Sequence, residues 1–162
     1  MELVEFSADA LASVSARVAF ERVVPRDDST LFRGFLVLPA VTRISDETGP
    51  WTRPGERRLV HLSDGGRFQE ELLRYEPPAT PDAVGVFDYR VTGFTKLLAH
   101  LVSDAEAHWR YEPAGNGSRI RWSYGFRPLR GRRFVVRALI GPIWLMYMRR
   151  SLAECVRVAE GA

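Results

Sequence analysis

The sequence has few of the residues that hold a fold together covalently or through a metal. Its 162 residues include one cysteine, Cys155, and three histidines. One cysteine cannot form a disulfide within the chain, and the histidines lack the spacing of a metal site. No glycine-rich loop precedes a helix where it could bind a phosphate. We therefore predict no metal and no cofactor, and we expect Cys155 to pack as a small apolar side chain.

Long apolar runs are also absent. None reaches the ~18 to 20 residues that a membrane-spanning helix requires, and the longest candidate, 134–148, contains Arg137 and the Gly141-Pro142 pair. The N-terminus carries acidic residues rather than a basic region ahead of an apolar one, so we expect no secretory signal and a cytoplasmic location. We expect one domain over 1–162, with a core from about 13 to 160.

Lysine is the third scarce residue. Lys96 is the only one, and the formal net charge of +3 comes almost entirely from arginine. The arginine groups are dispersed and interleaved with acids, which is not typical of a nucleic-acid surface, so we predict no nucleic-acid partner. Arg130 to Arg133 and Arg149-Arg150 flank an apolar segment. This pattern suits either solvated helix ends or contact with an anionic membrane surface.

That apolar segment is the strongest pattern present. Apolar residues recur at helical spacing through 130–162, at Val135, Ala138, Leu139, Leu145, Met148, Leu152 and Val156. Arg137 is the only charged residue between Phe134 and Met148. A helix that is apolar nearly all round must be covered by other elements. The sequence therefore predicts a long C-terminal helix wrapped by the rest of the chain.

The upstream half predicts strands and short helices. Residues 1–12 carry no strong pattern and suit a short helix or a loose arm. Alternation over 14–24 predicts a first strand that ends at Pro25. Residues 26–44 predict one or two short helices, interrupted at Pro39. Residues 45–55 predict turns around a short edge strand, in which Trp51 either packs at the edge or belongs to an opening.

A hairpin is predicted over 57–77, with Gly65-Gly66 as its tight turn. That register sets Ser63 opposite Phe68, His61 opposite Glu70 and Leu59 opposite Leu72. Both faces of this hairpin are mixed, so its concave face stays undecided. Clear alternation over 83–94, 102–111 and 119–127, with a Pro-Ala-Gly-Asn-Gly turn at 113–117, predicts three more strands. Because an apolar sheet face must be covered, an α+β fold follows.

Several local strings resemble a known family. They are Gly-Glu-Arg-Arg-Leu-Val-His-Leu-Ser-Asp-Gly-Gly at 55–66, Glu-Glu-Leu-Leu-Arg-Tyr-Glu-Pro-Pro at 70–78, Trp-Arg-Tyr-Glu-Pro-Ala-Gly-Asn-Gly-Ser-Arg-Ile-Arg-Trp at 109–122 and Phe-Arg-Pro at 126–128. The chain resembles polyketide cyclase/dehydrase-like proteins of the START or Bet v 1-like superfamily. The resemblance implies a helix-grip fold, in which a curved seven-stranded antiparallel sheet grips the C-terminal helix, with two short helices after strand 1. It also implies a hydrophobic cavity between sheet and helix, and it says little about activity.

If that cavity exists, strand alternation and helical spacing predict which residues line it. The candidate ligand-binding residues are Phe87, Tyr89, Trp109, Trp122, Tyr124 and Phe126 from the sheet and Trp144, Tyr147 and Met148 from the helix. Aromatic walls with a few polar tips suit a flat, partly oxygenated apolar ligand. The same stripe of aromatic residues is also what a filled core would show, so both interpretations stay open.

Catalytic signals are weaker. His61 opposite Glu70 is the best acid/base pair that the predicted register offers, because a carboxylate can orient an imidazole. The alternative is an exposed cross-strand polar pair. Three functions remain: binding of a polyketide- or lipid-like molecule, a cyclase or dehydratase using His61, Glu70 and a tyrosine such as Tyr89 or Tyr124, and a membrane-peripheral or protein-interaction module. A homodimer also stays open.

Overall fold

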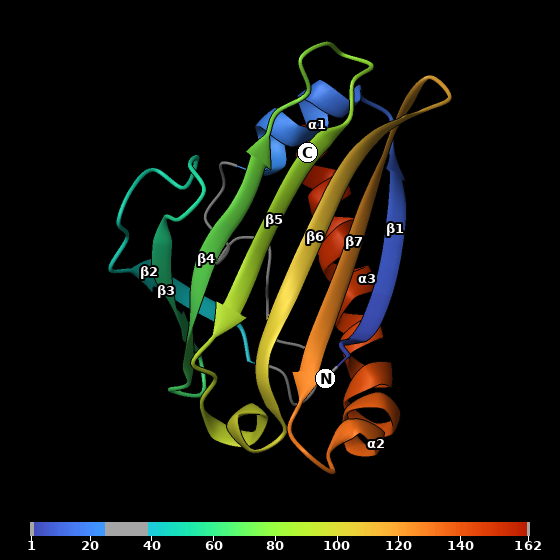
Figure 1. Ribbon diagram of the computed structural model, residues 1–162. Helices are drawn as coiled ribbons and strands as arrows, with labels where there is room; N and C mark the ends of the chain where they lie inside the picture. Colours follow the sequence, from blue (N-terminus) through green and yellow to red (C-terminus); the bar gives the residue numbers. More distant parts are fainter. Residues whose placement is uncertain (1, 25–38, 162) are drawn as a thin grey trace.

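The sheet is one curved antiparallel layer. The computed structural model describes residues 2–24 and 39–161. Within these residues, seven strands pair in the order β1-β7-β6-β5-β4-β3-β2, so β1 and β2 are the edges (Figure 1). The strands are β1 (Val4–Ala12), β2 (Val41–Ser45), β3 (Arg57–Leu62), β4 (Arg67–Glu76), β5 (Gly85–Thr92), β6 (Val102–Ala114) and β7 (Gly117–Pro128). The predicted α+β helix-grip architecture is confirmed.

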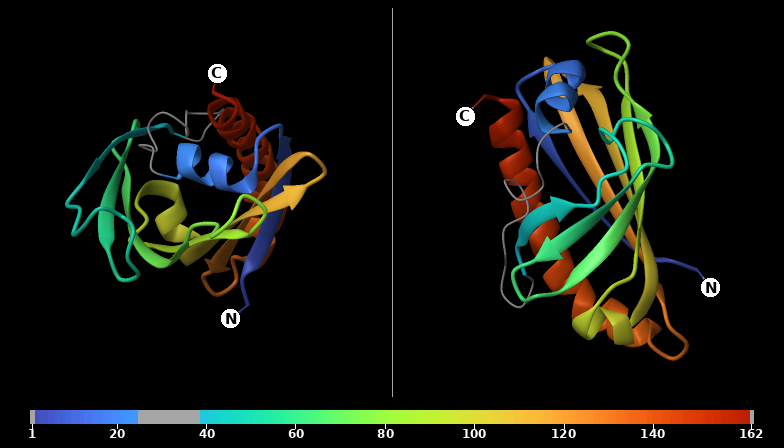
Figure 2. Two further views of the ribbon diagram at one scale, coloured as in Figure 1. Left: turned by 90° about the horizontal axis from the view of Figure 1, so that it is seen from above. Right: turned by 90° about the vertical axis from the view of Figure 1, so that its left-hand side faces the viewer.

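The helices lie on the concave side of this sheet. They are α1 (Ala16–Val23), the 3₁₀ helix η2 (Lys96–His100), the short α2 (Arg133–Val135), the π-helical turn η3 (Val136–Ile140) and α3 (Gly141–Ala159). Figure 2 shows α3 crossing the concave face, with α1 near its C-terminal end and η2 and α2 at the opposite end of the sheet. The predicted C-terminal helix is confirmed from Arg133 to Ala159. None of the helices in the described part of the chain is long and apolar enough to span a membrane.

A π-helical turn marks the place where this helix contains Gly141 and Pro142. Proline has no N–H to donate and its ring crowds the preceding turn, so a continuous α-helix is unfavourable there. The wider turn over Val136–Ile140 comes directly before Pro142, which occupies the first turn of α3. A Cβ at Gly141 would lie 2.7 Å from the Phe6 ring of β1, so a larger residue there would have to displace that ring. The helix therefore approaches the edge strand closely at this point.

The two predictions for the N-terminal segment are wrong. Residues 4–12 form β1 rather than a helix or a loose arm, and residues 16–23 form α1 rather than a strand. The inner side of β1 carries small alanines, so its apolar alternation is weak in the sequence. The strand nevertheless pairs with β7, with Val4 opposite Phe126. In α1, the Ser15 hydroxyl accepts a hydrogen bond from the Val18 amide at 3.2 Å and starts the helix.

The prediction of two short helices after the first strand is confirmed in part. Helix α1 follows β1, but most of the predicted 26–44 segment lies outside the described residues. Its last part is not helical, because Val41–Ser45 is the edge strand β2, paired with β3. Threonine, valine and isoleucine favour a pleated surface, and pairing with β3 decided the outcome. The segment expected to hold an edge strand, 45–55, is a loop after Ser45, the last residue of β2, and Trp51 has a φ of 63° in it.

The register predicted for the β3–β4 hairpin is wrong by three residues. Val60 pairs with Phe68, and Arg58 with Glu70, so His61 lies opposite Arg67. The turn is longer than two residues, because the Leu62 amide donates to the Gly66 carbonyl at 2.9 Å. Asp64 stabilises this longer turn by accepting from the Gly66 amide at 2.7 Å. A shift by an odd number of residues sends His61 and Glu70 to opposite faces.

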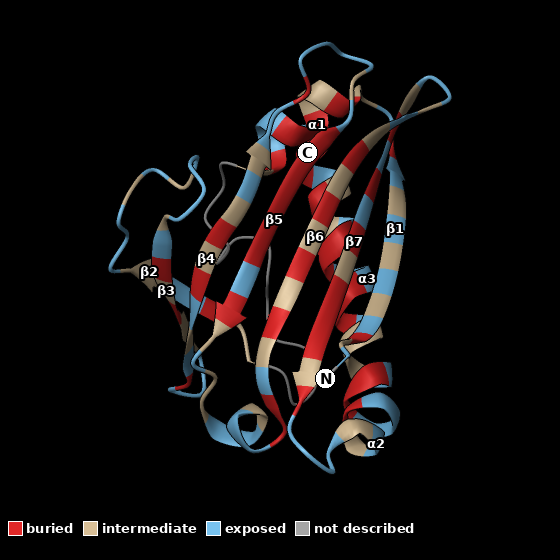
Figure 3. Cartoon of the chain, viewed as in Figure 1, coloured by how far each residue is buried: buried red, intermediate tan, exposed pale blue. Residues whose placement is uncertain are grey.

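The three remaining strands agree with prediction. Strands β5, β6 and β7 form long antiparallel ladders in which Trp109 pairs with Trp122. Figure 3 shows burial alternating along β6, as expected for a strand with one covered face. The C-terminal end of α3 is held by Arg22, whose Nη1 donates to the Ala159 carbonyl at 2.8 Å, and by Ser13, whose amide donates to the Glu160 carboxylate at 2.9 Å. Sheet and helix are thereby fixed at this end.

Candidate functional site

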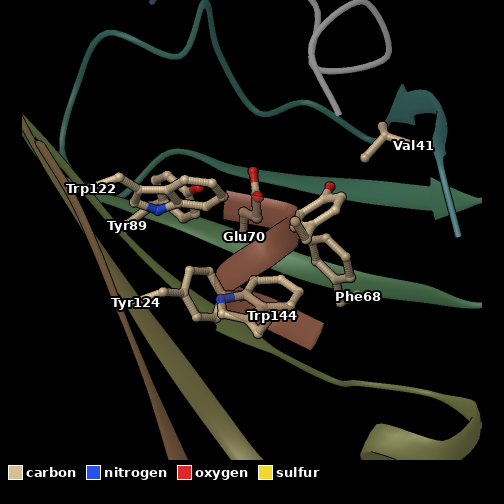
Figure 4. A pocket seen from close by; sticks show the side chains of 8 residues that line it. Val41, Phe68, Glu70, Tyr89, Trp122, Tyr124 and Trp144 are labelled. Atoms are coloured by element: carbon tan, nitrogen blue, oxygen red, sulfur yellow. The ribbon is translucent and has the colours of Figure 1, made fainter. Parts of the chain in front are cut away.

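A pocket lies between the concave face of the sheet and α3. It encloses about 330 Å³ of empty space, with the solvent at its mouth included. Its lining is aromatic apart from one aliphatic side chain and one carboxylate, and its members come from β2, β4, β5, β7 and α3 (Figure 4): Val41, Phe68, Glu70, Tyr89, Trp122, Tyr124, Trp144 and Tyr147. Strand alternation aims the sheet residues inward, and helical spacing sets Trp144 and Tyr147 on one side of α3.

The aromatic side chains pack against one another and form a rigid wall. Trp122 stacks on Trp109 with ring centroids 4.5 Å apart and planes only 14° from parallel. Tyr124 lies 4.7 Å from Trp144, which in turn lies 5.0 Å from Tyr147. Ring contacts of this kind add to burial and fix the orientation of each ring. The wall is therefore preorganised, at little conformational cost to a ligand that stacks on it.

Two further hollows continue this pocket toward the end of the sheet where η2 lies. The first, of about 540 Å³, shares Val41, Phe68 and Trp144 with the inner pocket and adds Phe94 and Leu98. The second, of about 620 Å³, shares Leu62 and Leu98 with the first and reaches Leu97, Ile140 and Ile143. Both volumes include open solvent. The three hollows share lining residues and so lie in a row from the aromatic wall toward η2 and the start of α3.

An ion pair is buried beside the inner pocket. Nε and Nη2 of Arg58 each lie 2.7 Å from Oε2 of Glu70, and both side chains are less than a tenth exposed. The Arg58 guanidinium also lies 4.2 Å from the centre of the Trp51 ring, which covers it from the 46–56 loop. Both bonds from Arg58 go to Oε2. Among the described residues, none donates a hydrogen bond to Oε1 of Glu70, and Glu70 is part of the pocket lining.

Two donors accompany this acceptor in the pocket lining. Burial, together with the charge of Glu70 and the neighbouring Tyr147, raises the pKa of Tyr124 well above its usual value of 10.0, so its hydroxyl stays protonated. The indole N–H of Trp144 is buried and has no hydrogen-bond partner among the described residues. A buried donor without a partner costs free energy that a ligand oxygen can recover. The site can thus bind a flat apolar molecule through stacking and a few hydrogen bonds.

The candidate ligand-binding residues fall into two groups. Tyr89, Trp122, Tyr124, Trp144 and Tyr147 line the pocket. The other four are buried in the adjoining core without lining a described pocket: Phe87, Trp109, Phe126 and Met148. Trp109 stacks on Trp122 from the neighbouring strand β6, and Phe126 packs 5.2 Å from Trp144, so these two residues hold the wall in position without lining the pocket.

The catalytic candidates are separated. Glu70 lines the pocket, whereas the Nε2 atom of His61 is hydrogen-bonded to the Ser45 hydroxyl at 2.7 Å, on the opposite face of β3. The predicted pairing of His61 with Glu70 is therefore wrong, and Arg58 takes its place. Sequence reasoning also missed Val41, which it assigned to a helix, and left Phe68 on an undecided face. The one signal for Arg58 was its position two residues before Val60, with which it shares a face.

The convex face holds a second buried carboxylate. Asp88 of β5 is bound by Arg110 at 2.5 Å and by Nδ1 of His108 at 3.2 Å. Burial opposes ionisation of Asp88, but the hydrogen bonds from His108 and Arg110 outweigh it and lower the pKa. The hydrogen bond to Asp88 raises the pKa of His108, and burial offsets this only in part. Within residues 2–24 and 39–161, no three His, Cys, Asp or Glu side chains are grouped so that they could hold a metal ion.

Comparisons with known proteins agree with this architecture. Residues 6–160 match the model of the family described as polyketide cyclase / dehydrase and lipid transport. The solved structure of the ZhuI aromatase/cyclase from Streptomyces sp. R1128 is similar, with a TM-score of 0.69, 12% identity, and coverage of 98% of this chain and 94% of that one. Ara h 8.0201 matches with a TM-score of 0.65 at 20% identity over 99% and 97% of the two chains.

A third similar structure is a point mutant of Thalictrum flavum norcoclaurine synthase in complex with a transition-state analogue. It has a TM-score of 0.63 and 15% identity, and the match covers 97% of each chain. No curated protein matches the sequence. At these identities the solved structures establish a shared fold and nothing about the ligand.

Proposed function

Because the chain belongs to the polyketide cyclase/dehydrase and lipid transport family, we propose that it binds a largely apolar, ring-containing small molecule between the sheet and α3. Family and fold support a role in hydrophobic ligand binding or cyclisation. The observation that carries the finer proposal is the composition of the inner pocket. Six of its eight lining residues are aromatic, and Glu70 is the single charged one. Sites for small molecules are typically apolar, with a few convergent polar groups.

The polar groups suggest what the ligand carries. Oε1 of Glu70 can accept a hydrogen bond from a hydroxyl or amine, while Tyr124 and the Trp144 indole can donate to a carbonyl or ether oxygen. A simple fatty acid has no hydrogen-bond donor for Glu70 and no ring to stack on the aromatic wall. Its carboxylate would also be repelled by the Glu70 carboxylate. The proposed ligand class is therefore an oxygenated aromatic or polyketide-like molecule rather than a fatty acid.

Native mass spectrometry of the purified protein tests binding directly. We expect a stoichiometric passenger, released and identified after denaturation. In a Leu62→Trp variant a large ring enters the shared wall of the two outer hollows, and the passenger should be lost. The matched control is Leu59→Trp, on the same strand and the opposite face. A ligand-free mass, with no thermal shift from polyketides, sterols or fatty acids, would contradict the proposal.

A second candidate function is a cyclase or dehydratase. It is favoured by one observation, that Glu70 and Tyr124 line the same pocket. Glu70 would accept a proton from a carbon next to a carbonyl, and the protonated Tyr124 hydroxyl would hydrogen-bond the resulting enolate oxygen. In this version Arg58 holds Glu70 in place through the bonds to Oε2, and His61 has no part.

The enzyme hypothesis is tested by a substitution that keeps shape. Glu70→Gln should abolish turnover of a polyketide substrate, while Glu71→Gln, the neighbouring carboxylate on the outer face, should leave it unchanged. Turnover by Glu70→Gln at the parent rate would reject the mechanism, and no turnover by the parent would leave ligand binding alone.

A cytoplasmic location remains a prediction from the N-terminal sequence.

A further inference from the structure

We propose that the end of the molecule formed by η2, α2 and η3 docks onto an anionic lipid bilayer. The surface consists of Lys96, Leu97 and residues 129–139 and is called the basic end below. Membrane docking is a separate property from the proposed ligand binding, because it depends on exposed side chains and charge rather than on what the pocket contains. Three observations carry it.

Exposed large apolar side chains gather at the basic end. Phe134 is 79% exposed, Leu97 61%, Leu139 60% and Leu129 37%. They come from two segments that are far apart in sequence but bound together, since the Leu129 amide donates to the Leu101 carbonyl at 2.8 Å. Figures 1 and 2 show η2 and α2 at the same end of the sheet, on either side of the ends of β6 and β7. Phe134 is almost fully exposed, an unfavourable position in water for a residue that only packs a monomer.

The charge of this surface has one sign. From residue 129 to residue 139 the sequence contains no aspartate or glutamate, and it contains four arginines. Arg130 and Arg137 are exposed, and neither is ion-paired with a described carboxylate. Arg132 and Arg133 donate only to backbone carbonyls, those of His100 and Glu2. These cations are therefore free to attract an anionic surface.

The outermost of the three hollows opens at the basic end. Its lining includes Lys96, Leu97, Ile140 and Ile143. Asp64, the acidic residue of that lining, is engaged by the Gly66 amide. Docking by this surface would place the mouth of the hollow against the bilayer, where apolar molecules dissolve.

A bilayer fits this surface better than a protein does. The apolar side chains are interspersed with arginines and come from separate short elements, so they do not form the continuous apolar core of a protein interface. Aromatic and aliphatic side chains among arginines are instead the pattern of a segment that lies in the membrane interface. The arginines would contact lipid headgroups while Phe134, Leu139 and Leu97 enter the acyl boundary.

Vesicle co-sedimentation of the intact protein without added ligand tests the proposal. We expect binding to phosphatidylcholine vesicles that contain phosphatidylserine, little binding to phosphatidylcholine alone, and weaker binding at higher salt. The double variant Arg130→Gln/Arg137→Gln should lower the partition coefficient about tenfold or more. Phe134→Ser should lower it about tenfold through lost apolar insertion. All three residues are exposed, so circular dichroism and thermal stability should match the parent.

Two matched controls keep the test specific. Arg149→Gln/Arg150→Gln removes the same charge from α3 beyond the basic end, and Leu11→Ser removes an apolar side chain from β1 that is 63% exposed. Both should bind vesicles as the parent does. Absence of binding to anionic vesicles, or loss of binding in the Arg149/Arg150 variant alone, would overturn the proposal. A concentration-dependent dimer that Phe134→Ser abolishes would instead assign the surface to a second copy. Passenger content, measured in the same samples, separates failure of docking from failure of ligand binding.

Discussion

The two faces of the sheet each bury one carboxylate, and the two environments differ. Glu70 on the concave face and Asp88 on the convex face are both about 5% exposed or less, and each is bound by an arginine. The partner of Glu70, Arg58, is itself only 8% exposed. The partners of Asp88 reach solvent, because Arg110 is 29% exposed and His108 is 34% exposed.

This difference separates a structural ion pair from a candidate site. The convex carboxylate is covered by the long side chains that bind it, and it lines none of the described pockets. The concave carboxylate is held on one side by Arg58 and adjoins empty space on the other. Burial alone would rank the two as equals. What distinguishes them is whether space for another molecule lies next to the charge.

Breaking the concave pair should have the largest effect. Arg58→Met leaves the Glu70 carboxylate buried beside apolar rings, and we expect a loss of about 3 to 5 kcal/mol in the free energy of unfolding. Replacing both residues, in Arg58→Met/Glu70→Leu, should recover most of that loss, because no uncompensated charge remains. Urea denaturation measures both. A loss below about 1 kcal/mol in the single variant would mean that the pair is effectively hydrated.

Breaking the convex pair should cost less. Asp88→Asn removes the charge that binds Arg110 and His108, but both can turn to water, so we expect a loss of about 1.5 to 3 kcal/mol. The control is Asp82→Asn, at an exposed position in the β4–β5 loop. Ligand binding should be unchanged in Asp88→Asn. A larger loss than in Arg58→Met would reverse the comparison between the two faces.

The pH dependence of stability should come from the convex face and be the smallest effect. The folded-state pKa of His108 is raised above its usual 6.5, so its contribution is complete below pH 6.5 and is lost as pH rises through the folded value. The pKa of Asp88 is lowered, so its contribution is present above its usual 3.8 and is lost as pH falls through the folded value. Stability from the cluster is therefore greatest between these two limits.

Urea denaturation across this range measures the effect. His108→Gln should remove the fall in stability above pH 6.5 and weaken the fall on the acid side, because His108 and Arg110 together lower the pKa of Asp88. The other groups around His108 are Glu106 and Arg110 on its own strand and Asp88 on β5, so His108 is the one that titrates near neutral pH. An unchanged slope in the variant would show that the fall does not come from this cluster.

Prediction from sequence succeeded where a strand or helix carried its own period over many residues. The ladder from β5 to β7 and the helix from Arg133 to Ala159 were predictable, because alternation and helical spacing both reflect one covered face. It failed at β1 and α1. The alanines of β1 are too small to give a clear apolar period, and the residues 14–20 fit alternation as well as the helical spacing that Ser15 starts.

The site depended on register, which the sequence did not determine. Asp64 and Gly66 lengthen the β3–β4 turn, and an odd shift exchanges the two faces of the hairpin. As a result Arg58 rather than His61 meets Glu70, and His61 turns away from the pocket.

The sequence by itself determined the architecture, because an apolar helix and a sheet with one apolar face can be buried only against each other. It also determined the aromatic character of the cavity wall, since strand alternation in β5 to β7 and helical spacing in α3 predict which residues point inward. Tertiary structure decided which polar groups reach the cavity and where it opens. Those depend on one turn, on pairing between β2 and β3, and on the packing of η2 beside the start of α3. Contacts between residues far apart in the chain leave no periodic pattern in the sequence.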